Sequence, residues 1–558
     1  MLEPSMSTGQ EPARRSDRLV RARLGLAGAA VAVLFYCAAL TPSLLPRAWY
    51  LQGIVAGLTA TIGYGAGATL GALVRLMWRR RFPRATRVAW WALLAVAVLG
   101  GLTMLALGTK WQQELRARLD MEPLATYDIV RIVGVSVLTF VILLGIARLL
   151  RLGIRRLARL LRRRVRVPRP IAYGVGLTVV TYLTVGFVDG FLVDNLLAAA
   201  DRTASLANGR TTAGIVAPRT ALRSGSPMSA APWHSLGLQG REFVGTGPTV
   251  DQLTAFARRP AREPVRLYAG LETAESAQAR AQVVVREMDR AGAFDRAVIG
   301  VVTPTGTGWV DHNVTDALEY MYGGDTALVS MQYSYLPSWI SFLADQSKVS
   351  ESATALITAV HARWSELPAA TRPKLLLFGE SLGSFGTETA FANSAAMTSG
   401  ADGILLVGPP FANPIRQALL DTRDPGSPIW DPVFTAGTVE FTQHPPDLRT
   451  PAGARPPAVV YLQNSSDPIV WWSPELIFQR PAWLDHPRGP DVSPDMHWYP
   501  LVTFWQTAVD QVFAINVPAG HGHVYGSGVA DGWAALAPPP GWSAADTVRL
   551  RQLLDRAG

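Results

Sequence analysis

The chain divides into two stretches with different patterns of hydrophobic and polar positions. Before residue 200, long uninterrupted apolar runs alternate with clusters of arginine. After about residue 263, short apolar runs of strand length alternate with amphipathic stretches of helical period. The first pattern is typical of membrane-spanning helices, and the second is typical of an α/β domain with a mostly parallel sheet.

Five apolar runs in the first stretch reach the ~20 residues that a helix needs to cross a bilayer. They are Leu24–Leu45, Leu51–Trp78, Val88–Leu107, Ile129–Leu150 and Ile171–Leu197. A cleaved signal peptide is excluded, because the first run is too long and four others follow it. Glycines at positions 57, 63, 65, 67 and 71 predict that the second helix packs closely against its neighbours.

The arginines predict how these helices are oriented. They crowd before the first run, between the second and third, and between the fourth and fifth, where ten arginines and no acid lie from Arg148 to Arg169. Because positive residues mark cytoplasmic connections, the N-terminus is expected inside and everything after residue 200 outside. We therefore expect a basic cytoplasmic leader (1–23), five membrane helices (24–197), a linker or irregular lead-in (198–262) and an outer α/β domain (263–558).

The composition of the chain indicates which kinds of binding partner to expect. The net charge of +10 comes mostly from arginines that flank apolar runs, so a lipid bilayer is expected as partner and nucleic acid is not. One cysteine, Cys37, excludes an intrachain disulfide and a cysteine metal cluster. No pattern predicts a cofactor or a metal ion, and the oligomeric state cannot be read.

Seven apolar runs in the second stretch predict strands: Arg266–Leu271, Ala297–Val302, Ala327–Tyr333, Lys374–Phe378, Gly403–Val407, Ala458–Leu462 and Val512–Ile515. Helical patterns such as Ala274–Ala291 and Glu351–Leu367 separate most of them. The fourth strand leads into Gly379-Glu380-Ser381-Leu382-Gly383, which fits G-x-S-x-G, and a helical pattern follows. This strand–turn–helix context predicts that Ser381 is a nucleophile on a strained turn. A tight turn without chemistry is the alternative.

A serine needs a base and an acid, which this kind of domain supplies later in the chain, in the order acid then histidine. Asp467 follows the strand Ala458–Leu462 and is the expected acid, although an Asp before Pro468 could simply form a turn. His521 and His523 follow the last expected strand on a glycine-rich loop. One of them is the expected base, and His521 is favoured because it directly follows Gly520.

The reaction also needs hydrogen-bond donors for an oxyanion. The backbone amide of Leu382, the residue after the nucleophile, is expected to be one. The loop after the strand Ala297–Val302 is expected to give the second, from the segment Thr305, Gly306 and Thr307. This loop lacks the spacing of a phosphate-binding loop.

Four motifs together resemble the membrane-anchored α/β-hydrolase family of actinobacteria. They are Phe378–Gly383, Thr305–Asp311, Gln332–Trp339 and Gly520–Gly526. The resemblance covers nearly the whole chain. It implies an N-terminal multi-span region, an α/β-hydrolase fold and a triad of Ser381, Asp467 and a histidine of the glycine-rich loop, but no substrate.

Two long insertions, after residue 408 and between Ile469 and Thr507, are rich in aromatic residues and are expected to cap the serine. Aromatic residues there could line an acyl-chain pocket or only form the core of the cap. The leading expectation is a carboxylic-ester hydrolase that acts on a lipid or acyl ester at the outer membrane surface. An acyltransferase with the same triad, a peptidase or thioesterase, and a non-catalytic envelope receptor or transport partner are the alternatives.

Overall fold

The computed structural model describes residues 24–77, 87–124, 128–165, 167–187, 194–344, 346–435, 437–448 and 456–557. The expected leader, 1–23, lies outside the described residues. The chain forms two compact units: residues up to 41, 48–109 and 127–147 in the first, and residues 42–47, 110–126 and 148 onward in the second. Two short segments between apolar helices therefore belong to the unit that holds the sheet.

Apolar helices make up the N-terminal part of the chain. They are α2 (Leu26–Ala39), α3 (Trp49–Met77), α4 (Arg87–Arg118), α5 (Ile129–Arg164) and α6 (Arg169–Phe187). Among the described residues, α3 to α6 are long and apolar enough to cross a membrane, while α2 has only 14 residues. The prediction that the first span extends to Leu45 is wrong. Helix α2 ends at Ala39, and Pro42 follows, which disfavours helical backbone at the residue before it.

Small residues let α3 approach both of its neighbours within the first unit. A Cβ atom on Gly67 would lie 2.5 Å from the carbonyl oxygen of Ala27 on α2, and one on Gly57 would lie 2.5 Å from that of Ser136 on α5. Both distances are shorter than any real contact, so only glycine fits. The predicted close packing of this helix is confirmed at these positions.

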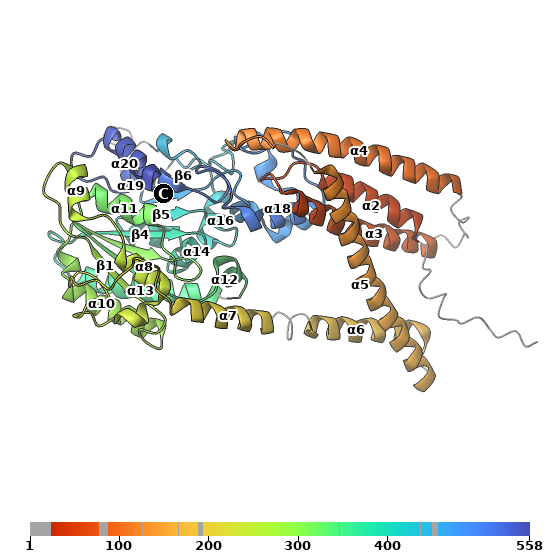
Figure 1. Cartoon of the computed structure of the whole chain (residues 1–558), viewed down its shortest axis with the longest axis horizontal. Coiled ribbons are helices and arrows are strands. Elements are labelled where there is room, and N and C mark those ends of the chain that lie inside the picture. The colour runs from red at the N-terminus through yellow and green to blue at the C-terminus, as the bar shows by residue number, and fades with distance from the viewer. Residues whose placement is uncertain are drawn as a thin grey trace, which may run out of the picture. The chain divides into compact units, whose positions relative to one another are not determined.

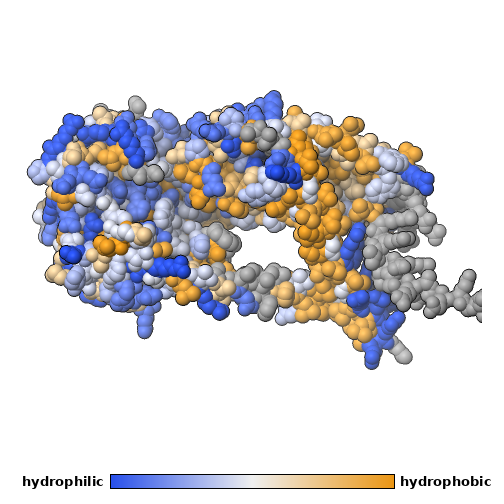
Figure 2. Space-filling model, viewed as in Figure 1, coloured by the Kyte–Doolittle hydropathy of each residue, from blue (hydrophilic) through white to orange (hydrophobic). Residues whose placement is uncertain are grey.

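The other faces of these helices carry large apolar side chains at the surface. Leu99 on α4 is 68% exposed and Val141 on α5 is 58% exposed. Figure 2 shows such residues, in orange, gathered over the N-terminal helices. A soluble surface rarely carries so wide an apolar area, whereas a bilayer would cover it.

A seven-stranded sheet forms the second unit. Its strands are β1 (Val265–Ala269), β2 (Val298–Thr303), β3 (Thr326–Met331), β4 (Lys374–Glu380), β5 (Gly403–Val407), β6 (Val439–Thr442) and β7 (Val459–Leu462). The order is β1-β3-β2-β4-β5-β7-β6, and every neighbouring pair is parallel. Strand β4 lies at the centre. The predicted fold class, apolar N-terminal helices followed by an α/β-hydrolase fold, is confirmed.

Apolar residues on the two faces of the strands enter two separate cores. In β4, Leu376 and Phe378 join the cluster with α11 (His312–Met321) and α19 (Val529–Leu536), and Leu375 and Leu377 join the cluster with α10 (Ala277–Arg290) and α13 (Gln346–Ser365). Figure 1 shows the sheet between these helices. Burial on both faces explains why the strands read as continuous apolar runs.

Shorter helices complete the second unit. The α-helices are α7 (Asp194–Asn208), α8 (Gly237–Gly245), α9 (Val250–Ala257), α12 (Ser338–Ala344), α14 (Leu382–Thr389), α15 (Ser394–Ser399), α16 (Pro414–Asp421), α17 (Pro468–Trp471), α18 (Val502–Asp510) and α20 (Ala544–Ala557). The 3₁₀ helices are η2 (Trp233–Leu236), η3 (Ala293–Asp295), η4 (Pro445–Asp447), η5 (Pro474–Ile477), η6 (Ala482–Leu484), η7 (Gln511–Phe513) and η8 (Gly526–Gly528). Helices α7, α8 and α9 lie in the region expected to be an irregular linker.

The strand expected at Val512–Ile515 does not form. Residues Gln511–Phe513 are the 3₁₀ helix η7, and the side chains of Val512 and Ile515 are 73% and 68% exposed. The edge of the sheet is occupied instead by β6, which lies in the insertion after residue 408 and was not predicted. The histidine loop therefore follows a short helix rather than a strand.

A third apolar cluster lies outside the sheet. It joins the second insertion, with Trp471, Leu484 and Met496, to Leu45 and Leu119 from the two segments between N-terminal helices. All five side chains are at most 5% exposed. The insertion thus packs against these segments as well as against its own residues.

Candidate active site

Ser381 occupies the turn between β4 and α14. Its backbone has φ 52° and ψ −125°, which a residue with a Cβ atom rarely adopts. Glycine is required on both sides: a Cβ on Gly379 would lie 2.4 Å from the carbonyl oxygen of Gly383, and one on Gly383 would lie 2.4 Å from that of Thr303. The turn has the form of a nucleophile elbow, which holds a serine above the end of a central strand.

Asp467 lies on the loop after β7, and its side chain is fully buried. Its Oδ2 atom is 2.6 Å from Nδ1 of His523 and accepts a 2.8 Å hydrogen bond from the hydroxyl of Tyr525. Its Oδ1 atom accepts from the amide of Ile469 at 2.8 Å. In this contact a carboxylate oxygen accepts and Nδ1 of His523 donates, so Nε2 lies on the side of the ring away from Asp467.

His523 and Ser381 are brought together by the end of β5. The amide of Ser381 donates to the carbonyl of Val407 at 2.8 Å. The next residue, Gly408, lies under the imidazole, since a Cβ there would be 2.4 Å from Cε1 of His523. Among the described residues, His523 is hydrogen-bonded to Asp467 and not to the Ser381 hydroxyl. In structures without substrate such a bond is often long or misaligned.

The loop after β2 starts next to the elbow, because Thr303 pairs with Gly379 in the sheet. The amide of Thr305 donates to the carbonyl of Trp309 at 2.9 Å, so it is not available for an oxyanion. The amides of Gly306 and Thr307 make no such bond within the described residues. Leu382, as the first residue of α14, has an amide without an acceptor in its own helix.

Two buried carboxyl groups near the site were not predicted. Burial, followed by the nearby Asp311 and Asp467, raises the pKa of Glu380 well above its usual value. Burial also raises the pKa of Asp311 to about 6. Burial thus favours the protonated, neutral form of Glu380 next to the nucleophile position. Glu380 and Asp311 both belong to motifs singled out in the sequence, but only burial identifies them.

Family models cover most of the chain. A model of the α/β-hydrolase family matches residues 265–550, and a model of the N-terminus of an α/β-hydrolase family matches residues 40–248. The chain belongs to the α/β-hydrolase family. No curated protein and no solved structure gave a significant match.

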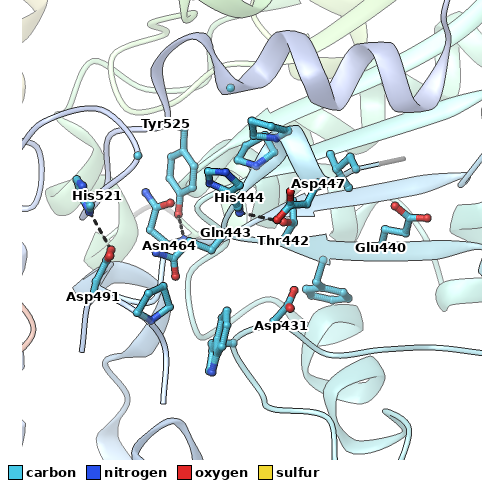
Figure 3. Close-up of a pocket in the computed structure, with 18 of the residues that line it drawn as sticks. Asp431, Glu440, Thr442, Gln443, His444, Asp447, Asn464, Asp491, His521 and Tyr525 are labelled. Atoms are coloured by element: carbon cyan, nitrogen blue, oxygen red, sulfur yellow. Dashed lines mark hydrogen bonds and ion pairs between the residues drawn. The ribbon is translucent and has the colours of Figure 1, made fainter. Parts of the chain in front are cut away.

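His521, the favoured base, does not contact the acid of this hydrolase. Its Nδ1 atom is 3.0 Å from Oδ2 of Asp491, and its Nε2 atom is 3.4 Å from Oδ2 of Asp120 (Figure 3 shows the contact with Asp491). The bond from Asp491 is the main reason that the pKa of His521 is raised. The geometry therefore favours His523 over His521 as the base.

Asp491 also links the loop that carries His521 and His523 (the histidine loop) to the loop that carries Asp467. Its Oδ2 atom accepts from the hydroxyl of Ser466 at 2.6 Å, and the oxygen of Ser466 accepts from the amide of Gly522 at 2.9 Å. Asn464 adds a second tie, since its Nδ2 donates to the carbonyl of Gly522 at 2.9 Å. These bonds fix the backbone on which His523 sits. One signal for these bonds is visible in the sequence, the position of Ser466 beside Asp467.

A pocket of about 1020 Å³ adjoins these loops, and Figure 3 shows side chains that line it. His521, Asp491, Asn464 and Tyr525 line it, together with residues of β6. Ser381 does not line it, so its volume carries no information about the substrate of the hydrolase. No group of three or more His, Cys, Asp or Glu side chains suited to a metal ion occurs among the described residues.

Proposed function

We propose that this hydrolase cleaves carboxylic esters through a triad of Ser381, His523 and Asp467. The observation that carries the proposal is the 2.6 Å contact between His523 and buried Asp467, beside a serine in the strained backbone of an elbow. A serine hydroxyl is a poor nucleophile until an oriented imidazole takes its proton. Each group that this activation needs is present.

In the proposed reaction, Nε2 of His523 takes the proton of Ser381 as Oγ bonds to the ester carbonyl carbon. The carbonyl electron pair moves to oxygen, and the amides of Leu382 and of Gly306 or Thr307 stabilise the resulting oxyanion. When the intermediate collapses, the C–O bond to the alcohol breaks and His523 protonates the leaving oxygen. Water then attacks the acyl-serine by the same route and releases the carboxylic acid.

An aromatic row supports a substrate with a long acyl chain. The rings of Phe342, Phe411, Trp472 and Phe504 follow one another at centroid distances of 5.9, 5.3 and 5.2 Å. The row begins close to the nucleophile, since Phe342 packs against the apolar cluster that contains Leu382, the residue after Ser381. Aromatic side chains of this kind suit an apolar chain better than a polar acyl group.

A membrane location on the outer side is part of the proposal. Four long apolar helices with exposed side chains support an anchor. Leu44, Leu45, Leu115 and Leu119 lie in two segments that the arginine bias puts outside, and they pack in one apolar cluster with Trp471 and Ala514 of the hydrolase domain. This agrees with an outer position for the hydrolase domain.

The test of activity is labelling of the full-length protein by a fluorophosphonate, which reacts with activated serines. Labelling is expected for the wild type, none for Ser381→Ala, and wild-type labelling for Ser399→Ala, which changes an exposed serine. Labelling of Ser381→Ala at the wild-type rate would refute the assignment of Ser381 as the nucleophile.

A series of p-nitrophenyl esters tests the substrate class. The value of kcat/KM should rise with the length of the acyl chain, and Phe411→Ala should weaken that rise. Product analysis with an added alcohol separates hydrolysis from acyl transfer.

The side of the membrane can be tested in whole cells with a maleimide that does not cross membranes. In a Cys37→Ala background, Ser399→Cys should react, and Arg155→Cys, in a connection expected inside, should not. The reverse pattern would place the hydrolase domain in the cytoplasm.

A further inference from the structure

We infer that the segment Pro42–Arg47, between α2 and α3, positions the catalytic histidine loop of the hydrolase. The inference rests on the proposed function, because it concerns the base of the proposed triad. The segment lies in the same compact unit as the sheet, although helices of the apolar N-terminal region precede and follow it in the chain.

A buried ion pair anchors the segment. Nε of Arg47 is 2.8 Å from Oδ1 of Asp510, at the end of α18, and both side chains are fully buried. The other oxygen of Asp510 accepts from the amides of Leu44 at 3.1 Å and Leu45 at 3.4 Å. The amide of Arg47 donates to Oε1 of Gln112 at 2.9 Å. A buried charge needs such partners, so the conformation of the segment is tightly specified.

Asp510, which forms this buried ion pair, is close in sequence to the residue that holds the proposed base. Ala514 lies four residues after Asp510 and is packed in one apolar cluster with Leu44 and Leu45. Its carbonyl accepts a 2.8 Å hydrogen bond from the amide of His523. The backbone of the proposed base is therefore held by a residue whose own position depends on the segment.

Leu45 also supports the residue before the base. A Cβ on Gly522 would lie 3.5 Å from Cδ2 of Leu45 and 2.6 Å from the carbonyl oxygen of Ala514. Gly522 has φ 49°, which glycine adopts readily, and a side chain at this position would collide with the carbonyl of Ala514 and stand against Leu45. The histidine loop thus adjoins Ala514 and Leu45 through Gly522. It is also hydrogen-bonded to Ser466 and Asn464.

As a consequence, the hydrolase site is incomplete without the segment that connects α2 to α3. A fragment that starts at residue 198 would lack Leu45 and the cation for Asp510. It would also expose the apolar cluster that Leu44 and Leu45 help to fill. Activity is therefore expected to require the full chain.

The test compares two substitutions in the full-length protein in detergent. Leu45→Ala and Leu484→Ala each remove the same atoms from the same cluster, where both leucines are at most 1% exposed, so they should lower the unfolding temperature to a similar extent. Leu45 belongs to the segment Pro42–Arg47 and Leu484 does not. Leu45→Ala should lower kcat for a p-nitrophenyl ester and the fluorophosphonate labelling rate about tenfold at unchanged KM, whereas Leu484→Ala should stay within about twofold of the wild type.

Equal effects of the two substitutions on kcat, or a wild-type rate for folded Leu45→Ala, would overturn the inference. If the alanine variants do not fold, Leu45→Val and Leu484→Val allow the same comparison, and Leu45→Met should restore kcat. Failure of the proposed function is distinct from these outcomes, because the wild type itself would then not be labelled.

Discussion

Nδ1 of His523 and Oδ2 of Asp467 meet at 2.6 Å although 56 residues separate them in the chain. The contact is enclosed, since Asp467 is fully buried and His523 is 9% exposed. A charge-assisted hydrogen bond in such a place holds the imidazole in one tautomer and one orientation. Its loss should therefore affect the rate much more than the fold.

Replacing Asp467 by Asn should lower kcat/KM for an ester by about 1,000- to 10,000-fold, because the amide can favour the wrong tautomer of His523. The measurement is initial-rate kinetics with a p-nitrophenyl ester. Asp485→Asn, at an exposed carboxylate paired with Arg480, is the control and should retain wild-type activity. A loss below about tenfold for Asp467→Asn would assign the acid to another residue.

The two histidines should differ in their importance. His523→Gln should reduce the fluorophosphonate labelling rate by at least about 1,000-fold, since it removes the base. His521→Gln should reduce it about tenfold or less, because His521 only ties its loop to Asp491. The reverse order would identify His521 as the base.

The buried acid beside the nucleophile should give a pH-dependent stability. The pKa of Glu380 is raised in the folded protein, mainly by burial, so the native state binds its proton more tightly than the unfolded state does. The unfolded state has the usual value near 4.5, so stability from this group is full below that pH and is lost as pH rises through the folded pKa.

Glu380→Gln should therefore raise the unfolding temperature at pH 9 and change it little at pH 5. Each unit by which the pKa is raised corresponds to about 1.4 kcal/mol at high pH. Glu366→Gln, at an exposed side chain, should show no such difference. A stabilisation of equal size at both pH values would show that the charge of Glu380 is not its cause.

Arg47→Met should destabilise the protein by about 3–5 kcal/mol, because it leaves Asp510 buried without its cation. The double variant Arg47→Met/Asp510→Asn should recover part of the loss. Thermal unfolding in detergent measures both. Lys110→Met breaks an exposed pair with Glu114 and should have little effect, so a similar loss from it would contradict the assigned role of burial.

The strand–turn–helix at Ser381 and the position of Asp467 on the loop after β7 could be located from sequence because their signals are local. A strand followed by G-x-S-x-G and a helix leaves few backbone arrangements. The choice between His521 and His523 could not be made in this way. Both lie on one tight turn, closed by a bridge between His521 and Val524, and the partner of each depends on loops distant in sequence.

Hydropathy also could not show where the apolar residues Leu44 and Leu45 are buried. A protein core and a lipid bilayer accept the same side chains, so these residues read as the end of a membrane helix. Val512–Ile515 was mistaken for a strand for a related reason. Short apolar runs suit strands and helices alike, and the edge position was already taken by β6.

The place of Leu44 and Leu45 in the core of the second unit has a consequence for biosynthesis. The ribosome makes these residues long before Ala514, their partner in the cluster. At about 5–20 residues per second, the delay is on the order of a minute. During that time Leu44 and Leu45 have no Ala514 to pack against, and the segment between α2 and α3 waits for residues made much later. Maturation of the site is therefore a late event, completed only when nearly the whole polypeptide has been synthesised.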